Sequence, residues 1–375
     1  MIKKLTSILL VFALTFTSAL TVVYGEENGA ASNVWKEFYV SESGSDSNDG
    51  SREHPFMTIK KAKETAASIS DSMSGDIVIN IAGGTYRIDE TLDFTNADSG
   101  KNGHSIIYRG DKDNKPVISG GRTVDNFRQS ADYPGLYEAY LPDYEKYGIR
   151  ELYVNDSKRF VAISERYITP AGNYQEEGSK NSSDGIIVSK DDIPKFDNPD
   201  DVTQAEFVWL NEWKKTMCCP ISIEENLKDK STMIVKFGTV VNNEFAGPGI
   251  KFQIQNCMGV LDTPGEFYYN KRTGMLYYMP YADEKPDNLQ LVVPNLEFCM
   301  FFIGNGVSYP VENISFENLK IEHFTRWFND TYYSIMQADI GPAYNGSSLR
   351  GNTRGAVYID KASNVNFINN IFCNM

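Results

Sequence analysis

The sequence has few of the residues that build disulfide-rich or metal-centred folds. Only 5 cysteines and 3 histidines occur among its 375 residues. So few cysteines cannot make a disulfide framework, and the adjacent pair Cys218 and Cys219 lacks the C-x2-C spacing of a zinc site. Cys257, Cys299 and Cys373 stand in apolar contexts that are typical of core residues. We therefore predict no metal site and no resident cofactor.

The sequence is also short of positive charge and of long apolar runs. Its formal net charge is −14, from 36 Lys and Arg against 50 Asp and Glu. This balance opposes binding to nucleic acid or anionic lipid, where basic residues that neutralise phosphates supply most of the affinity. After residue 25, no segment is apolar over the roughly 20 residues that a membrane span needs. We predict no nucleic-acid partner, and no membrane association for the chain without its first 25 residues.

Residues 1–25 have the three parts of a secretory signal peptide. Lys3 and Lys4 precede an apolar stretch centred on residues 8–14, and small residues lie near Gly25. Interspersed Thr and Ser residues keep the apolar stretch too short for a membrane anchor. We predict cleavage after Gly25 and a secreted, extracellular protein, and we leave attachment to the cell surface open.

The rest of the sequence predicts an all-β fold with a helix near its start. Thr58 suits the N-cap of a helix whose apolar residues, from Ile59 to Ile69, recur at helical spacing. Short strands separated by turn residues follow, from residues 77–81 to residues 117–118. A solenoid of strands is one such architecture, and its exposed first coil needs a cover. We expect the helix to be that cap.

Residues 122–295 differ from the segments on either side. They are rich in aromatic residues and contain a predicted hairpin, with strands at 267–269 and 275–278 around an N-K-R-T-G turn. We predict a β-rich module inserted between coils. The predicted domains are a signal peptide (1–25), a cap with the first coils (26–121), the inserted module (122–295) and further coils (296–375).

The last part of the sequence contains an internal repeat. Residues 313–318 (N-I-S-F-E-N) align with residues 364–369 (N-V-N-F-I-N) at an offset of 51 residues. Solenoid units usually have roughly 20 to 45 residues, so this offset indicates two coils or one coil with an insertion. The alternating apolar residues predict strands that face a common interior, with Asn318 and Asn369 stacked at equivalent turns.

Six motifs carry a resemblance: F-Y-V-S (38–41), P-F-M-T-I (55–59), P-G-E-F-Y-Y (264–269), T-G-M-L-Y-Y (273–278), I-S-F (314–316) and H-F-T-R-W (323–327). They resemble motifs of bacterial pectin-lyase-like β-helix proteins, in particular glycoside hydrolase family 141 and its relatives. The resemblance covers nearly all of the mature chain and implies a right-handed parallel β-helix, a single-stranded solenoid that handles polysaccharides. It also implies catalytic acids in later coils than those before Met375, so no catalytic residue is carried over, and the chain is expected to be an N-terminal portion of such a protein.

The leading functional prediction is a secreted, glycoside hydrolase-like protein that acts on or binds cell-wall polysaccharide or oligosaccharide. Whether this portion of the chain is active is left open. One alternative is a pectate-type polysaccharide lyase, the only prediction that requires a calcium cofactor. Another is a non-catalytic glycan-binding or surface-adhesion protein.

Two carboxyl groups commonly carry out glycoside hydrolysis. The candidate acids in the last part of the sequence are Glu317, Glu322, Asp330, Asp339 and Asp360. Each of them also fits an ordinary solvated carboxylate. Asp360 is the best of this weak set because it stands at the end of the strand predicted at 357–359.

Segment 323–339 is the predicted glycan-binding segment. It combines aromatic faces with planar hydrogen-bond donors, a mixture that suits the apolar faces and hydroxyl edges of sugar rings. Packing of the aromatic residues onto the solenoid wall is the alternative. The predicted substrate-binding residues are His323, Arg326, Trp327, Tyr332 and Gln337.

The last predicted strands carry a hazard. Residues 365–368 and 371–372 would leave unpaired backbone and apolar side chains at an open sheet edge. Such edges pair readily with other chains. We therefore predict self-association through this coil.

Overall fold

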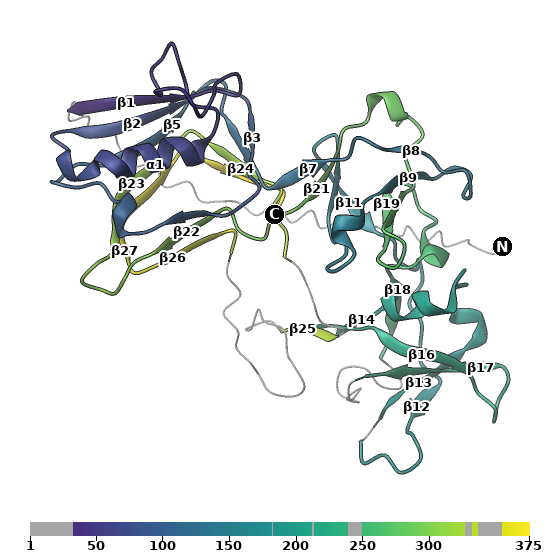
Figure 1. The fold of residues 1–375 in the computed structure, drawn as a ribbon. Coiled ribbons are helices and arrows are strands. Elements are labelled where there is room, and N and C mark those ends of the chain that lie inside the picture. The colour runs from purple at the N-terminus through teal and green to yellow at the C-terminus, as the bar shows by residue number, and fades with distance from the viewer. Residues whose placement is uncertain (1–32, 182, 212–213, 239–249, 327–331, 337–354) are drawn as a thin grey trace, which may run out of the picture. The chain divides into compact units, whose positions relative to one another are not determined.

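The computed structural model describes residues 33–375 except 182, 212–213, 239–249, 327–331 and 337–354 (Figure 1). The predicted signal peptide, residues 1–25, lies outside the described residues. Residues Val34–Met375 form one compact unit. That unit is mostly β, as the sequence predicts. Within the described ranges, none of the helices has the length and apolar character that crossing a membrane requires.

Helix α1 (Ile59–Ile69) begins at the predicted N-cap. The Thr58 side chain accepts a hydrogen bond from Lys61 N at 3.1 Å, so one of the unpaired amide groups of the first turn is satisfied. Ile59, Ala62 and Ala66 are buried along one stripe and join the apolar core that β1 and β2 also line. The helix therefore packs onto the first strands of the chain.

The strands outside residues 121–294, except β25, form three parallel sheets. The chain passes through the first, second and third sheet in turn and then returns to the first, as β2, β3, β4 and β5 show. The first sheet has the order β1 (Val34–Val40), β2 (Asp76–Ile81), β5 (Ile106–Gly110), β23 (Val311–Glu317) and β27 (Ala362–Ile368). The second has the order β28 (Ile371–Phe372), β24 (Lys320–Glu322), β6 (Val117–Ser119) and β3 (Thr85–Arg87). The third has the order β26 (Val357–Asp360), β22 (Met300–Ile303) and β4 (Leu92–Phe94).

Aromatic rings stack between neighbouring strands inside these sheets. The rings of Phe94 and Phe302 lie 4.7 Å apart, and those of Tyr108 and Phe316 are also 4.7 Å apart. Phe367 continues the second stack at 5.3 Å from Phe316. Equivalent positions of successive strands therefore put large apolar groups directly above one another, which fills the interior.

Asparagines stack at two positions, at the bends after β23 and β27 and within these two strands. Asn369 Nδ2 donates to Asn318 Oδ1 at 2.7 Å, and Asn364 Nδ2 donates to Asn313 Oδ1 at 2.8 Å. All four residues have positive φ between 50° and 59°, a conformation that asparagine tolerates better than most residues. The predicted contact between Asn318 and Asn369 is therefore present as a hydrogen bond.

Residues 121–294 form further sheets in which neighbouring strands are antiparallel, except for β11 beside β19. The largest has the order β7 (Gly121–Thr123), β21 (Leu291–Pro294), β10 (Leu152–Val154), β11 (Ser157–Val161), β19 (Glu266–Asn270), β20 (Met275–Tyr278), β9 (Tyr137–Tyr140) and β8 (Arg128–Gln129). Another has the order β12 (Gly172–Tyr174), β13 (Gly185–Ser189), β17 (Thr232–Phe237) and β16 (Pro220–Glu225). In a third, β18 (Phe252–Gln255), β14 (Glu206–Asn211) and β15 (Lys214–Cys218) are joined by β25 (Tyr332–Met336).

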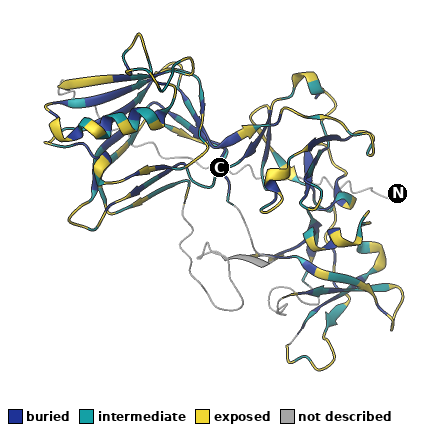
Figure 2. Cartoon of the chain, in the orientation of Figure 1, coloured by how far each residue is buried: buried dark blue, intermediate teal, exposed yellow. Residues whose placement is uncertain are grey.

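Short 3-10 helices connect many of these strands. They are Ser70–Ser72, Asn96–Asp98, Pro142–Tyr144, Lys190–Asp192, Pro199–Gln204, Met258–Val260 and Pro286–Asn288. Buried residues lie mainly on the strands and exposed ones on the connections (Figure 2).

The all-β prediction is confirmed, but the chain has several sheets rather than a single solenoid. The predicted hairpin is present as β19 and β20, paired antiparallel from Phe267 with Tyr278 to Asn270 with Met275. Hairpins of this kind need only a local turn, whereas parallel strands need a long connection. The strands between β6 and β22 therefore pair mainly with one another and build cores of their own.

Candidate functional site

A hollow of about 410 Å³ opens among the antiparallel strands. Its lining mixes aromatic rings with charged and amide side chains, which come from the chain before β10, the start of β14 and the turn after β19. The lining residues used below are Tyr147, Arg150, Gln204, Glu206, Asn256 and Lys271. Such a mixture of a few polar groups with apolar walls is typical of small-molecule sites.

Glu206 is a buried carboxylate in the lining of this hollow. The residue is only 1% exposed, and one of its carboxylate oxygens pairs with the Arg150 guanidinium. The other oxygen accepts a hydrogen bond from Gln255 Nε2 at 2.5 Å. Because both oxygens are engaged, Glu206 holds the lining together rather than transferring a proton.

A second network holds the turn that lines the hollow. Arg272 binds both oxygens of Asp201, at 2.7 and 3.1 Å. Gln204 Oε1 accepts a hydrogen bond from Lys271 N at 2.6 Å. The turn at residues 271–272 is therefore held by both Asp201 and Gln204. Burial raises the pKa of Cys219, another lining residue, to about 12, which keeps its thiol protonated and unreactive at neutral pH.

The predicted glycan-binding segment is only partly described. Arg326 is half-buried, whereas Trp327 and Gln337 lie outside the described residues. The backbone of Tyr332 pairs with Cys218 in the β15–β25 ladder, next to Cys219 in the hollow. The segment therefore runs beside the hollow at this point.

A polar cluster with two buried members lies where the β10–β11 hairpin meets the second parallel sheet. Its members are Asp156, Glu322 and His323, each of which has a potential ligand atom within 4.8 Å of those of the other two. Glu322 and His323 are 4% and 3% exposed, whereas Asp156 is exposed. We call these three residues the junction cluster.

The two strand residues of the cluster are positioned by the parallel sheet. Glu322 ends β24 and pairs with Ser119 of β6. His323 follows with a φ of 63°, and its amide donates to Asn374 O at 2.8 Å. A Cβ on Gly121 would lie 2.9 Å from His323 Cβ, so a glycine is needed beside the histidine.

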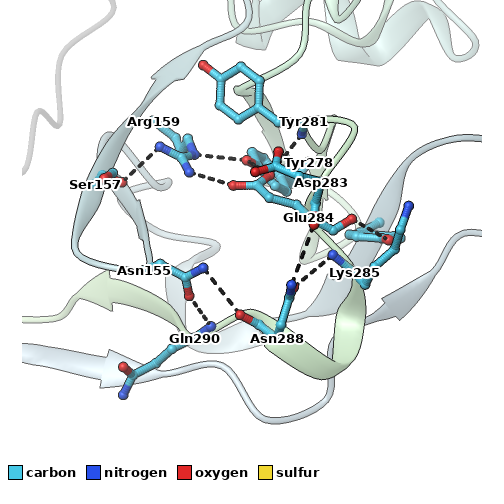
Figure 3. Close-up of polar contacts among 11 residues, drawn as sticks. Asn155, Ser157, Arg159, Tyr278, Tyr281, Asp283, Glu284, Lys285, Asn288 and Gln290 are labelled. Carbon is cyan, nitrogen blue, oxygen red and sulfur yellow. Dashed lines mark hydrogen bonds and ion pairs between the residues drawn. The ribbon is translucent and has the colours of Figure 1, made fainter.

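Asp156 is positioned by a tight turn. Asn155 and Asp156 both have positive φ, 49° and 61°, and connect the paired residues Val154 and Ser157. This is the type I′ geometry that suits two-residue hairpins. The turn is held because Asn155 Oδ1 accepts from Gln290 N at 2.8 Å and its Nδ2 donates to Asn288 O at 3.2 Å (Figure 3).

A buried ion pair fastens the same hairpin to the loop after β20. Arg159 donates to Glu284 at 2.6 Å and to the Tyr278 hydroxyl at 2.8 Å (Figure 3). The Tyr278 hydroxyl donates to the other Glu284 oxygen at 2.6 Å. These contacts form a closed network, so the hairpin that carries Asp156 has a rigid base.

Glu322 has several neighbours on one of its oxygens. Lys320 Nζ lies 2.7 Å from Oε2, Cys373 Sγ lies 3.6 Å from it, and Asn374 Nδ2 lies 3.3 Å from it. The other oxygen, Oε1, lies 3.7 Å from His323 Nδ1. The carboxylate thus faces a cation on one side and an imidazole on the other.

His323 is a buried imidazole with one nitrogen in use. Nδ1 lies 3.1 Å from Ser119 Oγ, and Nε2 has no partner among the described residues. The ring of Tyr153 lies 4.7 Å away, and its buried hydroxyl also lacks a described partner. Burial lowers the pKa of His323, while the charges of Glu322 and Asp156 oppose that shift. The imidazole is therefore neutral at pH 7.

Asp360, the predicted catalytic candidate, stands at the end of β26 as expected. Its carboxylate pairs with the neighbouring Lys361 at 2.8 Å, and its side chain is 40% exposed. This is the environment of an ordinary surface ion pair.

Sequence reasoning missed Asp156 and most of the hollow. The signal for Asp156 was the Asn155-Asp156 pair, which favours a two-residue turn. Glu322 and His323 were both singled out, but for separate roles. Nothing in the sequence shows that a turn in the middle of the chain meets β24.

The chain matches no family model. The uncharacterized protein YwoF of Bacillus subtilis (strain 168) is 29% identical over 187 residues, which is 47% of this chain and 35% of YwoF. A solved structure described as a glycoside hydrolase superposes with a TM-score of 0.71 at 21% identity, over 89% of this chain and 61% of that one.

The likeness to the solved glycoside hydrolase establishes a shared fold. A second structure, described as the complex of XylC with xylose, has a TM-score of 0.32 at 14% identity over 77% of this chain and 35% of that one, too low to indicate a common fold. The chain spans less than two thirds of the length of each of these proteins.

Proposed function

We propose that this protein is a secreted, carbohydrate-active protein of the glycoside hydrolase type. In this proposal the three parallel sheets are the faces of a right-handed parallel β-helix, α1 is its cap and residues 122–295 are an inserted module. The succession of parallel strands and the fold shared with a glycoside hydrolase support it. Secretion rests on the signal-like residues 1–25.

In this proposal a polysaccharide or oligosaccharide binds in the hollow beside β25, which is the main observation in its favour. Tyr147 places an aromatic ring in the lining, with Lys146 Nζ 4.6 Å from its centroid, and Asn256 adds an amide group whose Nδ2 donates to Gln204 O. Of the predicted residues, Tyr332 lies on β25, and its backbone pairs with Cys218, the residue before Cys219 of the lining. Glu206 and Arg150 line the hollow with their charges paired, which suits a neutral glycan.

The test is binding of the purified chain to a panel of plant and bacterial cell-wall polysaccharides, measured by calorimetry. We expect Tyr147→Ala to weaken binding by about tenfold, because one aromatic contact contributes roughly 1.4 kcal/mol. Trp327→Ala should have a similar effect. The matched control is Tyr309→Ala, since Tyr309 is 63% exposed on the loop before β23, outside the hollow.

Product analysis separates the three functions. Release of new reducing ends without added metal supports a hydrolase. Calcium-dependent release of unsaturated uronides would instead identify a lyase, and binding without turnover would identify a glycan-binding or adhesion protein. Absence of binding to every polysaccharide, or equal losses in Tyr147→Ala and Tyr309→Ala, would remove the hollow as the binding site.

A further inference from the structure

The junction cluster has the composition of a metal site rather than that of a structural ion pair. It brings two carboxylates and one imidazole together, with all three potential ligand atoms within 4.8 Å of one another. From this geometry we infer that Asp156, Glu322 and His323 bind one divalent cation of borderline softness, with zinc as the preferred ion. This site is separate from the proposed glycan-binding hollow and does not depend on it.

The buried polar groups around the cluster are a second observation that points to a ligand. His323 is 3% exposed, and its Nε2 has no partner among the residues that the structure describes. Tyr153 is fully buried against the imidazole ring, and its hydroxyl lacks a described partner as well. Buried polar atoms are normally hydrogen-bonded, because each one left alone costs roughly 1 to 3 kcal/mol. Two such atoms on rings that contact each other indicate a place built for something other than protein contacts.

The ligand types select the metal class. Imidazole and carboxylate together suit zinc and other first-row divalent ions, whereas calcium and magnesium prefer oxygen ligands alone. The sequence predicts no metal site because Asp156 lies far from Glu322 and His323 in the chain, and no spacing motif joins them.

The three ligand atoms must move slightly closer together to bind zinc. Tetrahedral zinc with ligand distances of about 2.0 Å places its donors about 3.3 Å apart, so donors up to 4.8 Å apart must approach by roughly 1 to 1.5 Å. Asp156 is exposed on its turn and can make this movement, while the Arg159 network keeps the base of the hairpin in place.

Lys320 is the competing cation. Its ammonium group occupies Glu322 Oε2 at 2.7 Å, while Oε1 faces His323 Nδ1 at 3.7 Å. The metal therefore enters on the Oε1 side, between carboxylate and imidazole. The Lys320 side chain is 26% exposed, so its ammonium group can turn toward water when a second cation binds on the other oxygen.

The experiment measures metal content and thermal stability of the full chain. After removal of metals with EDTA, the protein is loaded with zinc, dialysed and assayed by mass spectrometry for bound metal. We expect about one zinc per chain and a rise in Tm on adding zinc, because an ion that binds only the folded state stabilises it. Calcium should give a much smaller shift in Tm.

The variants are chosen so that folding survives. Asp156→Asn keeps the positive-φ turn, and His323→Asn keeps a residue that tolerates a φ of 63°. Each should lower zinc affinity at least tenfold, since even changes beyond the direct ligands commonly cost 10- to 100-fold. The matched control is Asp143→Asn, an exposed carboxylate paired with Arg122, which should bind zinc as the unchanged chain does.

Three results would overturn the inference. One is less than about 0.1 zinc per chain after loading at micromolar free zinc, a concentration at which protein zinc sites of ordinary affinity are filled. Another is equal affinity in Asp156→Asn and Asp143→Asn. The third is a calcium-induced rise in Tm as large as that with zinc. Because none of these measurements uses a glycan, failure here leaves the proposed function untouched.

Discussion

At the scale of single residues, burial changes the chemistry of Glu266. This carboxyl begins β19 and is 6% exposed, with backbone amides of Ile163 and Thr263 donating to it at 3.2 and 3.3 Å. Burial raises the pKa of Glu266 above its usual range, although these amides oppose the shift. The carboxyl therefore favours its proton more in the folded chain than in the unfolded chain.

Glu266 should make stability fall as pH rises. Below the unfolded pKa near 4.5, both states hold the proton and no penalty exists. As pH rises from there through the folded pKa, the unfolded state releases its proton first, so the free energy of unfolding declines. Glu266→Gln cannot titrate, and we expect its stability relative to the unchanged chain to improve between about pH 4 and about pH 7 in urea unfolding.

The control for this pH effect is Glu177→Gln, a change at an exposed carboxyl. Its stability relative to the unchanged chain should vary little over the same range. A Glu266→Gln difference that stays constant with pH would contradict the raised pKa. The side-chain amide in Glu266→Gln accepts one fewer backbone hydrogen bond than the carboxylate. The variant should therefore also lose a fixed amount of free energy of unfolding at every pH, on top of the pH-dependent gain.

At the scale of elements, the β10–β11 hairpin depends on its buried anchor. The side chains of Arg159 and Glu284 are 10% and 8% exposed, and Arg159 also lies over the Tyr281 ring at 5.1 Å. A hairpin on its own is marginally stable in water. The anchor therefore helps to keep the Asn155-Asp156 turn beside β24.

Arg159→Met should destabilise the chain by about 3 to 5 kcal/mol, because it leaves the buried Glu284 carboxylate without its cation. Urea unfolding at neutral pH measures the loss. The comparison is Arg122→Met, which breaks the exposed pair with Asp143, whose partners are 53% and 73% exposed. That change should cost no more than about 1 kcal/mol. Losses of similar size in the two variants would show that Arg159 is not an anchor.

At the scale of the whole molecule, the parallel sheets end in exposed strands. In the described residues, β27, β28 and β26 each stand at an edge of their sheets. Ile368, Ile371 and Phe372 are 51%, 45% and 44% exposed along those strands. An exposed edge with apolar side chains can pair with another chain.

We expect the purified 375-residue chain to self-associate through this edge. Light scattering should show oligomers or aggregates, and Ile368→Lys should shift the distribution toward monomer because an edge lysine opposes strand pairing. The control is Val307→Lys, at a position that is 88% exposed on the loop between β22 and β23. A monodisperse monomer with a cooperative melt in the unchanged chain would refute the expectation.

Local patterns predicted many of the elements correctly. The Thr58 cap, the hairpin at 267–278 and the contact between Asn318 and Asn369 all appear as expected. Each depends on residues that are close in sequence or repeated at a fixed offset. Helix spacing, turn chemistry and strand alternation act over such short ranges, so they can be recognised without a structure.

The sequence by itself determined the all-β class, the helix near the start and the acidic, cysteine-poor character that opposes nucleic-acid binding. Only the tertiary structure decided that Asp156 meets Glu322 and His323, that Arg150 closes on Glu206, and that β25 joins β15. The physical reason is that these partners come from separate strands. Their meeting depends on which apolar faces bury one another across the whole chain, and no local periodicity encodes that choice.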